Sequence, residues 1–531
     1  MKFGSLGVRC HSRPHALARP SNGRVRYGLT LTEVLIAVTV TLVLMAVLVN
    51  AFRDISSQIS DSRAILQMAG QLRSAAETIR EDLRGVTVPV EPWVNPADGL
   101  GYFEQAEFTI VADDPNFFDP TAGPPTLNRP DNVLGDIDDV MMFTARSTTR
   151  PFRGRIRLAD GSLTTIESPL AEIIIWTVLR DENGNGVLDR DIGEVLTVHR
   201  RTLLIRPDLN DDPVVFAAVG QVAGNNNLGA WYQNNDLSVH VSDVGLVANS
   251  LGDLSKREYR FAHTVATDAN FLAGTITDID ATLFPYPINR NWLNALTLTG
   301  NFEGEDVLLS DAVAFDIKLF DPRALIYGDE LFQATGIPKV ALVPGDPAYE
   351  TMILADVGNN NALDNMIDLG AYVNPGYLVQ AAINNSLPAL TTASDFSGLP
   401  QGKSQFGLAA IVTPTFSPLG YDTWPSHYES DGLNQDAAFV SAGVTYRDVD
   451  ASQSPTNALI DEGSDGFDSP HDTPGSGALL GQQINGADDA AERETSPPYV
   501  APLRGVEVMI RVVEPGSQQV RQTSVAVEFA K

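Results

Sequence analysis

The sequence predicts an α+β protein, with one long N-terminal helix packed on a large, loop-rich antiparallel β body. An apolar run is followed without a break by an amphipathic helical pattern that ends near residue 86. From residue 88 onward, short β-type runs alternate with Gly, Pro, Asn and Asp clusters. Hydrophobic residues make up 43% and charged residues 19% of the 531 residues, as is typical of a folded chain. With 43 Gly and 33 Pro, the body should contain many loops.

The first element is a basic segment followed by an apolar run. Residues 1–28 contain six basic and no acidic side chains, and residues 29–49 contain one charge, Glu33. At ~1.5 Å per residue, an apolar helix of this length reaches ~31 Å, the thickness of the hydrocarbon part of a bilayer. The basic flank would stay in the cytoplasm, so the body would lie outside the membrane. A secretory signal peptide is the alternative, but the run is long for one and no small-residue cleavage site follows it.

The helical pattern continues beyond the run of membrane length. Apolar residues recur at spacings of three and four, which marks one face of an amphipathic helix: Ile65, Met68, Leu72, Ala76, Ile79 and Leu83. The next Pro is Pro89. We therefore predict one helix over residues 29–86, with residues 29–49 in the membrane and the last third against the body.

A single carboxylate within the apolar run needs a physical reason. An unpaired acidic side chain deep in a bilayer costs ~2.5 kcal/mol or more on insertion scales. Glu33 either lies at the headgroup level, where it is tolerated, or pairs with a cation inside an assembly. The residues around it favour the second interpretation.

The sequence RYGLTLTEVL at residues 26–35 resembles the prepilin signature of type IV pilins and type II secretion pseudopilins. The resemblance implies that a membrane prepilin peptidase cuts after Gly28 and methylates the new amine of Leu29. It also implies that Glu33 meets the N-terminal amine of a neighbouring subunit during assembly. The match departs from the family at Leu29, where Phe is usual, at Thr32, where an aliphatic residue is usual, and at Tyr27, where a basic residue is common.

The helix over residues 64–86, AILQMAGQLRSAAETIREDLRGV, is similar to that of J-type minor pseudopilins and related minor pilins. Retention of Glu33 is unlike the K-type tip subunit, and the chain is far longer than a major subunit. The resemblance implies a non-enzymatic minor subunit of a pseudopilus or pilus in the bacterial cytoplasmic membrane. Its partners would be the peptidase, other subunits, the inner-membrane assembly platform and membrane lipid. A tethered binding module or carbohydrate-active enzyme is the alternative.

The sequence predicts strands and hairpins in the body, residues 87–531. A polar loop joins two β-type runs at residues 173–179 and 194–205, which predicts a hairpin. Alternating apolar residues at 506–512 and 525–529 flank turn residues and predict a second, C-terminal hairpin. Further strands are expected at residues 140–144 and 312–320, the latter ending at Asp321-Pro322.

The loop inside the first predicted hairpin is a candidate calcium site. Oxygen-bearing side chains stand at positions 1, 3, 5 and 9 of an EF-hand-like run, with Gly at position 6: Asp181, Asn183, Asn185 and Asp189. Position 12, where a bidentate Glu is expected, is Ile192. The alternative is a plain hairpin turn, because Asn-Gly pairs supply positive φ without a metal.

Charge and motif content narrow the function classes. The net charge is −31, and it would be −37 without the basic segment, which argues against nucleic-acid binding. Residues 448–494 hold 11 acidic groups and one base, and we expect a solvated surface loop there. The single cysteine, Cys10, excludes an intramolecular disulfide. The sequence has no HExxH or GxSxG motif, so we expect no catalytic activity.

Overall fold

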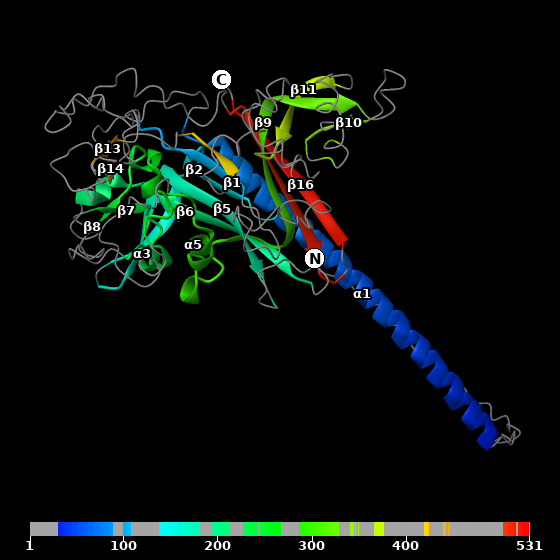
Figure 1. Ribbon diagram of the computed structural model, residues 1–531. Coiled ribbons are helices and arrows are strands. Elements are labelled where there is room, and N and C mark those ends of the chain that lie inside the picture. Colours follow the sequence, from blue (N-terminus) through cyan, green and yellow to red (C-terminus); the bar gives the residue numbers. More distant parts are fainter. Residues whose placement is uncertain are drawn as a thin grey trace, which may run out of the picture. The chain divides into compact units, whose positions relative to one another are not determined.

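One long helix and a ten-stranded antiparallel sheet dominate the computed structural model of the chain (Figure 1). The structure describes residues 30–88, 99–107, 137, 139–158, 160–180, 182, 193–211, 227–242, 245–266, 286–328, 340–344, 346, 349, 366–375, 419–423, 439–441, 444–446, 503–516 and 519–529. The chain divides into two compact units between Arg63 and Ala64. The division falls within the helix, so the helix contributes to both units.

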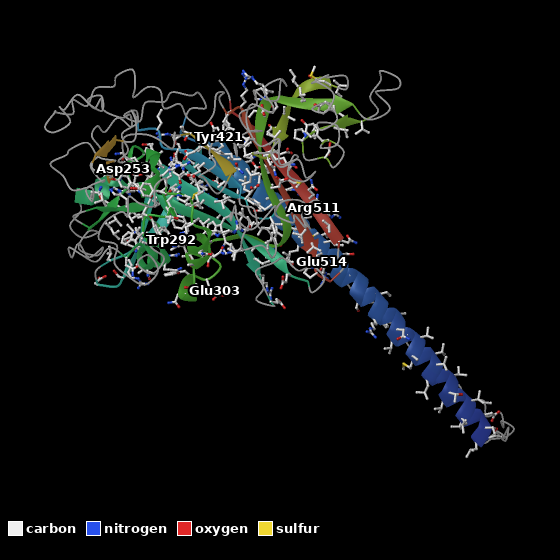
Figure 2. The ribbon with its side chains drawn as sticks, in the orientation of Figure 1. Asp253, Trp292, Glu303, Tyr421, Arg511 and Glu514 are labelled. Carbon is white, nitrogen blue, oxygen red and sulfur yellow. The ribbon has the colours of Figure 1, made fainter. Side chains whose placement is uncertain are left out.

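The helix α1 runs from Leu31 to Arg84 without interruption, which confirms the predicted long helix. Its first part, Leu31–Arg53, has a mean hydropathy of 2.6 and is long and apolar enough to cross a membrane. The apolar side chains of this part stand out from the helix (Figure 2), and none of its residues is buried. The predicted first helical residue, Leu29, lies outside the described residues.

In the second unit, the end of α1 forms part of the hydrophobic core. The predicted apolar stripe is buried from Met68 onward, and Ile79 and Leu83 are fully buried. These side chains belong to the same cluster as residues from the sheet. Burial of a helix stripe against a sheet is what stabilises an amphipathic helix of this kind.

The main sheet has the strand order β12-β1-β2-β5-β6-β9-β15-β16, and two further strands, β10 and β11, pair with β9. The bounds are Phe103–Glu107 for β1, Val140–Arg146 for β2, Leu170–Arg180 for β5, Val195–Leu204 for β6, Val307–Gly328 for β9, Ala341–Leu342 for β10, Met366–Val373 for β11, Leu419–Asp422 for β12, Gly505–Glu514 for β15 and Gln519–Glu528 for β16. The sheet curls strongly, because the ring of Phe103 on β1 lies 6.2 Å from that of Phe529, directly after β16.

Smaller elements complete the second unit. Three hairpins pair β3 (Phe152–Arg157) with β4 (Leu163–Ser168), β7 (Val239–Ser242) with β8 (Gly245–Ala248), and β13 (Phe439–Ser441) with β14 (Val444–Tyr446). Short helical turns are α3 (Leu228–Asn234), α5 (Arg290–Ala295), η4 (Pro207–Asp211), η5 (Asp253–Ser255), η6 (Arg257–Tyr259) and η8 (Gly300–Phe302).

The predicted hairpins are confirmed, and one predicted strand end is wrong. Strands β5 and β6 pair antiparallel over ten residues, and β15 pairs with β16 in an unbroken register. The strand expected at residues 312–320 continues through Pro322 as part of β9. Pro lacks an N–H group, but its place coincides with a register shift between Leu369 and Ala371 of β11, and bulges tolerate Pro.

The exit of α1 provides a test of close packing in this unit. An added Cβ at Gly85 would clash with the carbonyl oxygen of Arg146, whereas one at Gly70, on the exposed side of α1, would meet nothing within 4 Å. We expect Gly85→Ala to lower the free energy of unfolding by about 1–3 kcal/mol through overpacking. Gly70→Ala should raise it by about 0.5–1 kcal/mol, because Ala favours the helix.

Urea unfolding of both variants, followed by tryptophan fluorescence, measures these changes. Equal effects of the two substitutions, in either direction, would contradict the close approach of Gly85 to strand β2.

Candidate functional site

The start of α1 carries Glu33, the one described residue among those for which the sequence predicts a role in processing or assembly. Gly28 and Leu29 lie outside the described residues. Glu33 is exposed, and its Oε2 atom accepts hydrogen bonds from the backbone N–H and the hydroxyl of Thr30, both at 2.9 Å. The N–H of Glu33 donates in turn to Thr30 Oγ1 at 3.3 Å. These reciprocal bonds form a capping box, which satisfies backbone donors that a helix start leaves open.

Sequence reasoning missed this capping role, although the signal is present. A Thr followed three residues later by Glu, directly before an apolar run, is the sequence pattern of a capping box. Glu33 therefore stabilises the helix start in addition to any role in assembly.

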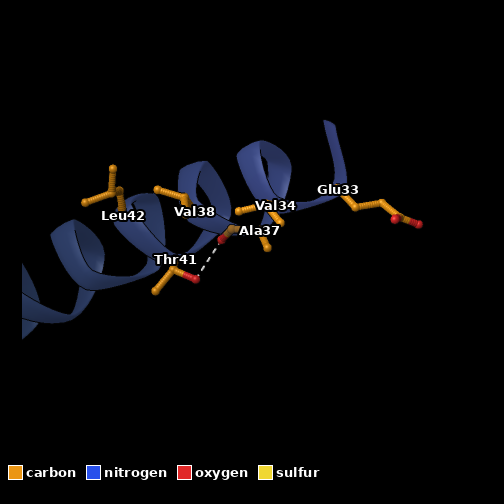
Figure 3. Close-up of a pocket in the computed structure, with 6 residues that line it drawn as sticks. All are labelled: Glu33, Val34, Ala37, Val38, Thr41 and Leu42. Atoms are coloured by element: carbon orange, nitrogen blue, oxygen red, sulfur yellow. Dashed lines mark hydrogen bonds between the residues drawn. The ribbon is translucent and has the colours of Figure 1, made fainter. Parts of the chain in front are cut away.

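The helix face beside Glu33 is shallowly hollowed. Six residues at helical spacing line the hollow (Figure 3): Glu33, Val34, Ala37, Val38, Thr41 and Leu42. The hydroxyl of Thr41 donates to the carbonyl oxygen of Ala37 at 2.7 Å, and that of Thr39 donates to Ile36 at 2.9 Å. Because these hydroxyls bond within the helix, they need no water, and the segment suits an apolar surrounding.

The predicted calcium ligands Asp181, Asn183, Asn185 and Asp189 lie outside the described residues, as does the acidic segment 448–494. The structure confirms that their loop joins the two strands of a hairpin, β5 and β6. Where the loop is described, the N–H of Glu182 donates to Glu194 Oε1 at 3.0 Å. Within the described ranges, no group of three or more His, Cys, Asp or Glu side chains could hold a metal ion.

Two buried histidines lie in strands. His199 on β6 stacks on Trp176 with ring centroids 5.3 Å apart. His240 on β7 shares a 2.6 Å hydrogen bond with Asn249 and stacks on Tyr259. Burial lowers the pKa of His240, so its ring favours the neutral form.

A buried charged cluster joins three distant segments of the second unit. Arg260 Nη1 donates to Glu104 Oε2 on β1 at 2.7 Å and to Asp422 Oδ2 on β12 at 2.8 Å. Arg257 Nε bonds the same Asp422 oxygen at 2.7 Å, and His263 Nε2 lies 3.0 Å from Glu104 Oε2. Sequence reasoning missed this cluster, because no spacing rule brings together residues up to about 320 positions apart.

A neighbouring carboxyl, Glu172 on β5, lies beside this cluster. It accepts hydrogen bonds from the hydroxyls of Tyr102 and Ser238, at 2.7 and 2.6 Å, and from the N–H of Phe261 at 3.1 Å. Burial raises the pKa of Glu172, although these donors and the charge of His263 oppose the shift. Burial by itself would also raise the pKa of Glu104, yet His263 and the two arginines hold it well below its usual range.

These groups are closed to solvent and bonded to one another. The Arg260 and His263 side chains are 0% exposed and that of Asp422 is 2% exposed. A substrate could not reach them without unfolding their surroundings. The cluster therefore clamps β12 and the segment 254–263 onto β1, and it is not a candidate catalytic centre.

A second buried ion pair joins α1 to the sheet. Arg200 on β6 binds both carboxylate oxygens of Asp82 with one edge of its guanidinium group, through Nε at 2.6 Å and Nη2 at 2.8 Å. Burial raises the pKa of Asp82, although the hydrogen bonds and charge of Arg200 act against that shift. Asp82 is only 5% exposed, so this carboxylate faces the body rather than solvent.

No protein-family model, no curated protein and no solved structure matches this chain.

The buried cluster predicts a pH-dependent effect of Glu104→Gln. The pKa of Glu104 in the folded chain lies below its ordinary value of 4.5, so its stabilising contribution is complete above pH 4.5 and is lost as the pH falls further. We expect the substitution to cost about 3–5 kcal/mol at pH 7. The difference from the parent chain should shrink by about 1.4 kcal/mol per pH unit below pH ~4.5.

Urea unfolding from pH 7 to pH 3 measures the effect. Glu167→Gln is the matched control, because its exposed pair with Arg153 should contribute less than about 1 kcal/mol. A Glu104→Gln difference that stays constant over the whole pH range would contradict the ionised state of Glu104.

Proposed function

We propose that the chain is a minor subunit of a type IV pilus or a type II secretion pseudopilus, and that it assembles through α1. The observation that carries the proposal is the division of this one helix. Its first part is apolar and exposed around a single acidic side chain, Glu33, whereas its last part is amphipathic and belongs to the core of the body. A simple membrane tether needs neither the carboxylate nor the continuous entry into the body.

The chemistry of Glu33 supports an assembly role. A carboxylate in an apolar surrounding is stabilised when a cation neutralises it. Cleavage after Gly28 would create such a cation, the amine of Leu29, at the start of every subunit. A lone subunit in lipid would carry two costly charges, and packed neighbours would pair them. This pairing gives the apolar helices a directional contact that lipid cannot supply.

The proposal also accounts for the partners and the location. A prepilin peptidase would remove residues 1–28, and an inner-membrane assembly platform would pass the processed helix to neighbouring subunits. The body would lie on the extracytoplasmic side, because the basic segment before α1 favours the cytoplasm. The large body favours a low-copy, minor position over that of the repeating subunit. The pilin-like character of the fold belongs to this proposal.

The proposal predicts processing at one bond. Co-expression with a prepilin peptidase should give a chain whose first residue is Leu29, as read by N-terminal sequencing. Gly28→Val should abolish the cut, because the peptidases of this family cut after Gly. Gly23→Val, a matched change within the same basic segment, should leave the cut intact. A chain that keeps the basic segment 1–28, or one that is cut after residue 50, would refute the proposed function.

The capping box allows the charge of Glu33 to be tested apart from its helix-capping role. Glu33→Gln keeps a capping side chain but removes the charge, whereas Thr30→Ala weakens the cap and keeps the charge. We expect Glu33→Gln to reduce recovery in the fibre fraction by about tenfold or more, because no carboxylate meets the neighbouring amine. Thr30→Ala should assemble at close to the parental level.

Immunoblots of sheared fibres measure both variants, with N-terminal sequencing to confirm that each is cut. Equal assembly of Glu33→Gln and the parent chain would remove the carboxylate from the mechanism. This result would favour the alternative, in which α1 only tethers the body to the membrane.

A further inference from the structure

Asp82 is a charged residue on the buried and otherwise apolar face of α1. The buried residues within residues 64–84 are Met68, Leu72, Ala75, Ala76, Ile79, Asp82 and Leu83. They recur at spacings of three and four and form one face of the helix, here called the seam. Within residues 64–84, Asp82 is the single charged side chain among the buried ones.

An apolar seam of this kind does not by itself define one position of the helix on the sheet. Hydrophobic burial is non-directional, and the seam repeats, so that a shift or rotation places one apolar side chain where another had been. Ala75 and Ala76 are small and add little shape that would resist such a movement. A single polar residue in a repeating apolar seam is the device that fixes register in coiled coils.

The contact of Asp82 with Arg200 has the directionality that the seam lacks. Two parallel N–H···O bonds, at 2.6 and 2.8 Å, fix both the distance and the rotation of the carboxylate relative to the guanidinium plane. Arg200 is itself held in place, because its backbone N–H donates to the carbonyl oxygen of Asp306 at 2.7 Å. A buried ion pair is weak evidence for stability, since well-packed apolar residues often do as well.

The chain directly after α1 is fixed to a different strand. The N–H of Arg146 donates to the carbonyl oxygen of Gly85 at 2.6 Å, and that of Thr87 donates to Thr144 at 3.0 Å. These bonds attach the exit of the helix to β2. They hold one point of the helix and leave its rotation and its tilt about that point to other contacts. The exposed Glu81 accepts one hydrogen bond from the hydroxyl of Thr149 at 3.0 Å, whereas the partly buried pair of Asp82 with Arg200 makes two parallel charged bonds and is the stronger directional contact.

We propose that Asp82 and Arg200 are positioning residues that set a single orientation of the body on residues 64–84 of α1. The pair selects one orientation of the helix on the sheet from several that would bury the apolar seam equally well. The inference goes beyond the proposed function and does not depend on it, because it concerns contacts within the second unit alone.

The test measures orientation and stability separately in the full-length chain in detergent. In a Cys10→Ser background, spin labels are attached at Arg73→Cys on α1 and Arg153→Cys on β3, both exposed positions. The parent should give one narrow distance distribution. D82L/R200M, which replaces the pair by apolar residues, should broaden or split it by about 5 Å, the length of one helix turn. Its thermal midpoint should stay within about 3 °C of the parent or rise.

The matched control removes an ion pair from the exposed side of the same helix. E77L/R80M should leave the distribution narrow, because Glu77 and Arg80 contact each other outside the seam. A narrow, unchanged distribution in D82L/R200M would overturn the proposal. Loss of the folded body in D82L/R200M would also overturn the proposal. The pair would then be needed for stability and not for selecting one orientation of the helix.

Discussion

The packing of the apolar stripe of α1 into the sheet core is the contact on which the rest of the body depends. An antiparallel sheet with one apolar face needs a second layer to cover it. Ile79 and Leu83 belong to the same buried cluster as Phe103 on β1 and Val527 on β16, near the two ends of the sheet path. One helix therefore connects a membrane-length apolar segment to a core that includes both ends of the curled sheet.

Buried charges add direction to this apolar packing. Asp82 and Arg200 join the helix to β6, while Arg260 joins β1 to β12 and to the segment that carries Arg260 itself. The carboxylates of Asp82, Glu104 and Asp422 each have a positively charged partner, which limits the penalty of removing them from water. At the start of α1, Glu33 caps the helix, and in the proposed assembly it would meet the amine of a neighbouring subunit. The chain thus places acidic side chains where an apolar contact alone would leave several arrangements open.

Residue patterns within short segments predicted the helix and the hairpins, which form from residues close together in the sequence. The spacing of Met68, Leu72, Ile79 and Leu83 predicted a buried stripe, and alternation predicted the hairpins β5–β6 and β15–β16. The sequence predicts a strand end at Asp321-Pro322, whereas β9 continues through it, because the bulge that accommodates Pro322 depends on pairing with β11. The pairing of Glu104 with Arg260 and of Asp82 with Arg200 could not be predicted, since each pair joins residues more than 100 positions apart. At the candidate site, the sequence identified Glu33 but missed its bonds to Thr30.

We propose that α1, freed of residues 1–28, is the assembly element of a fibre subunit. The most direct measurement is the intact mass of the chain recovered from the fibre fraction of its natural host. We expect the mass of residues 29–531 with one added methyl group on the N-terminal amine. Recovery of the uncut chain, or of the cut chain from membranes only and never from fibres, would contradict it.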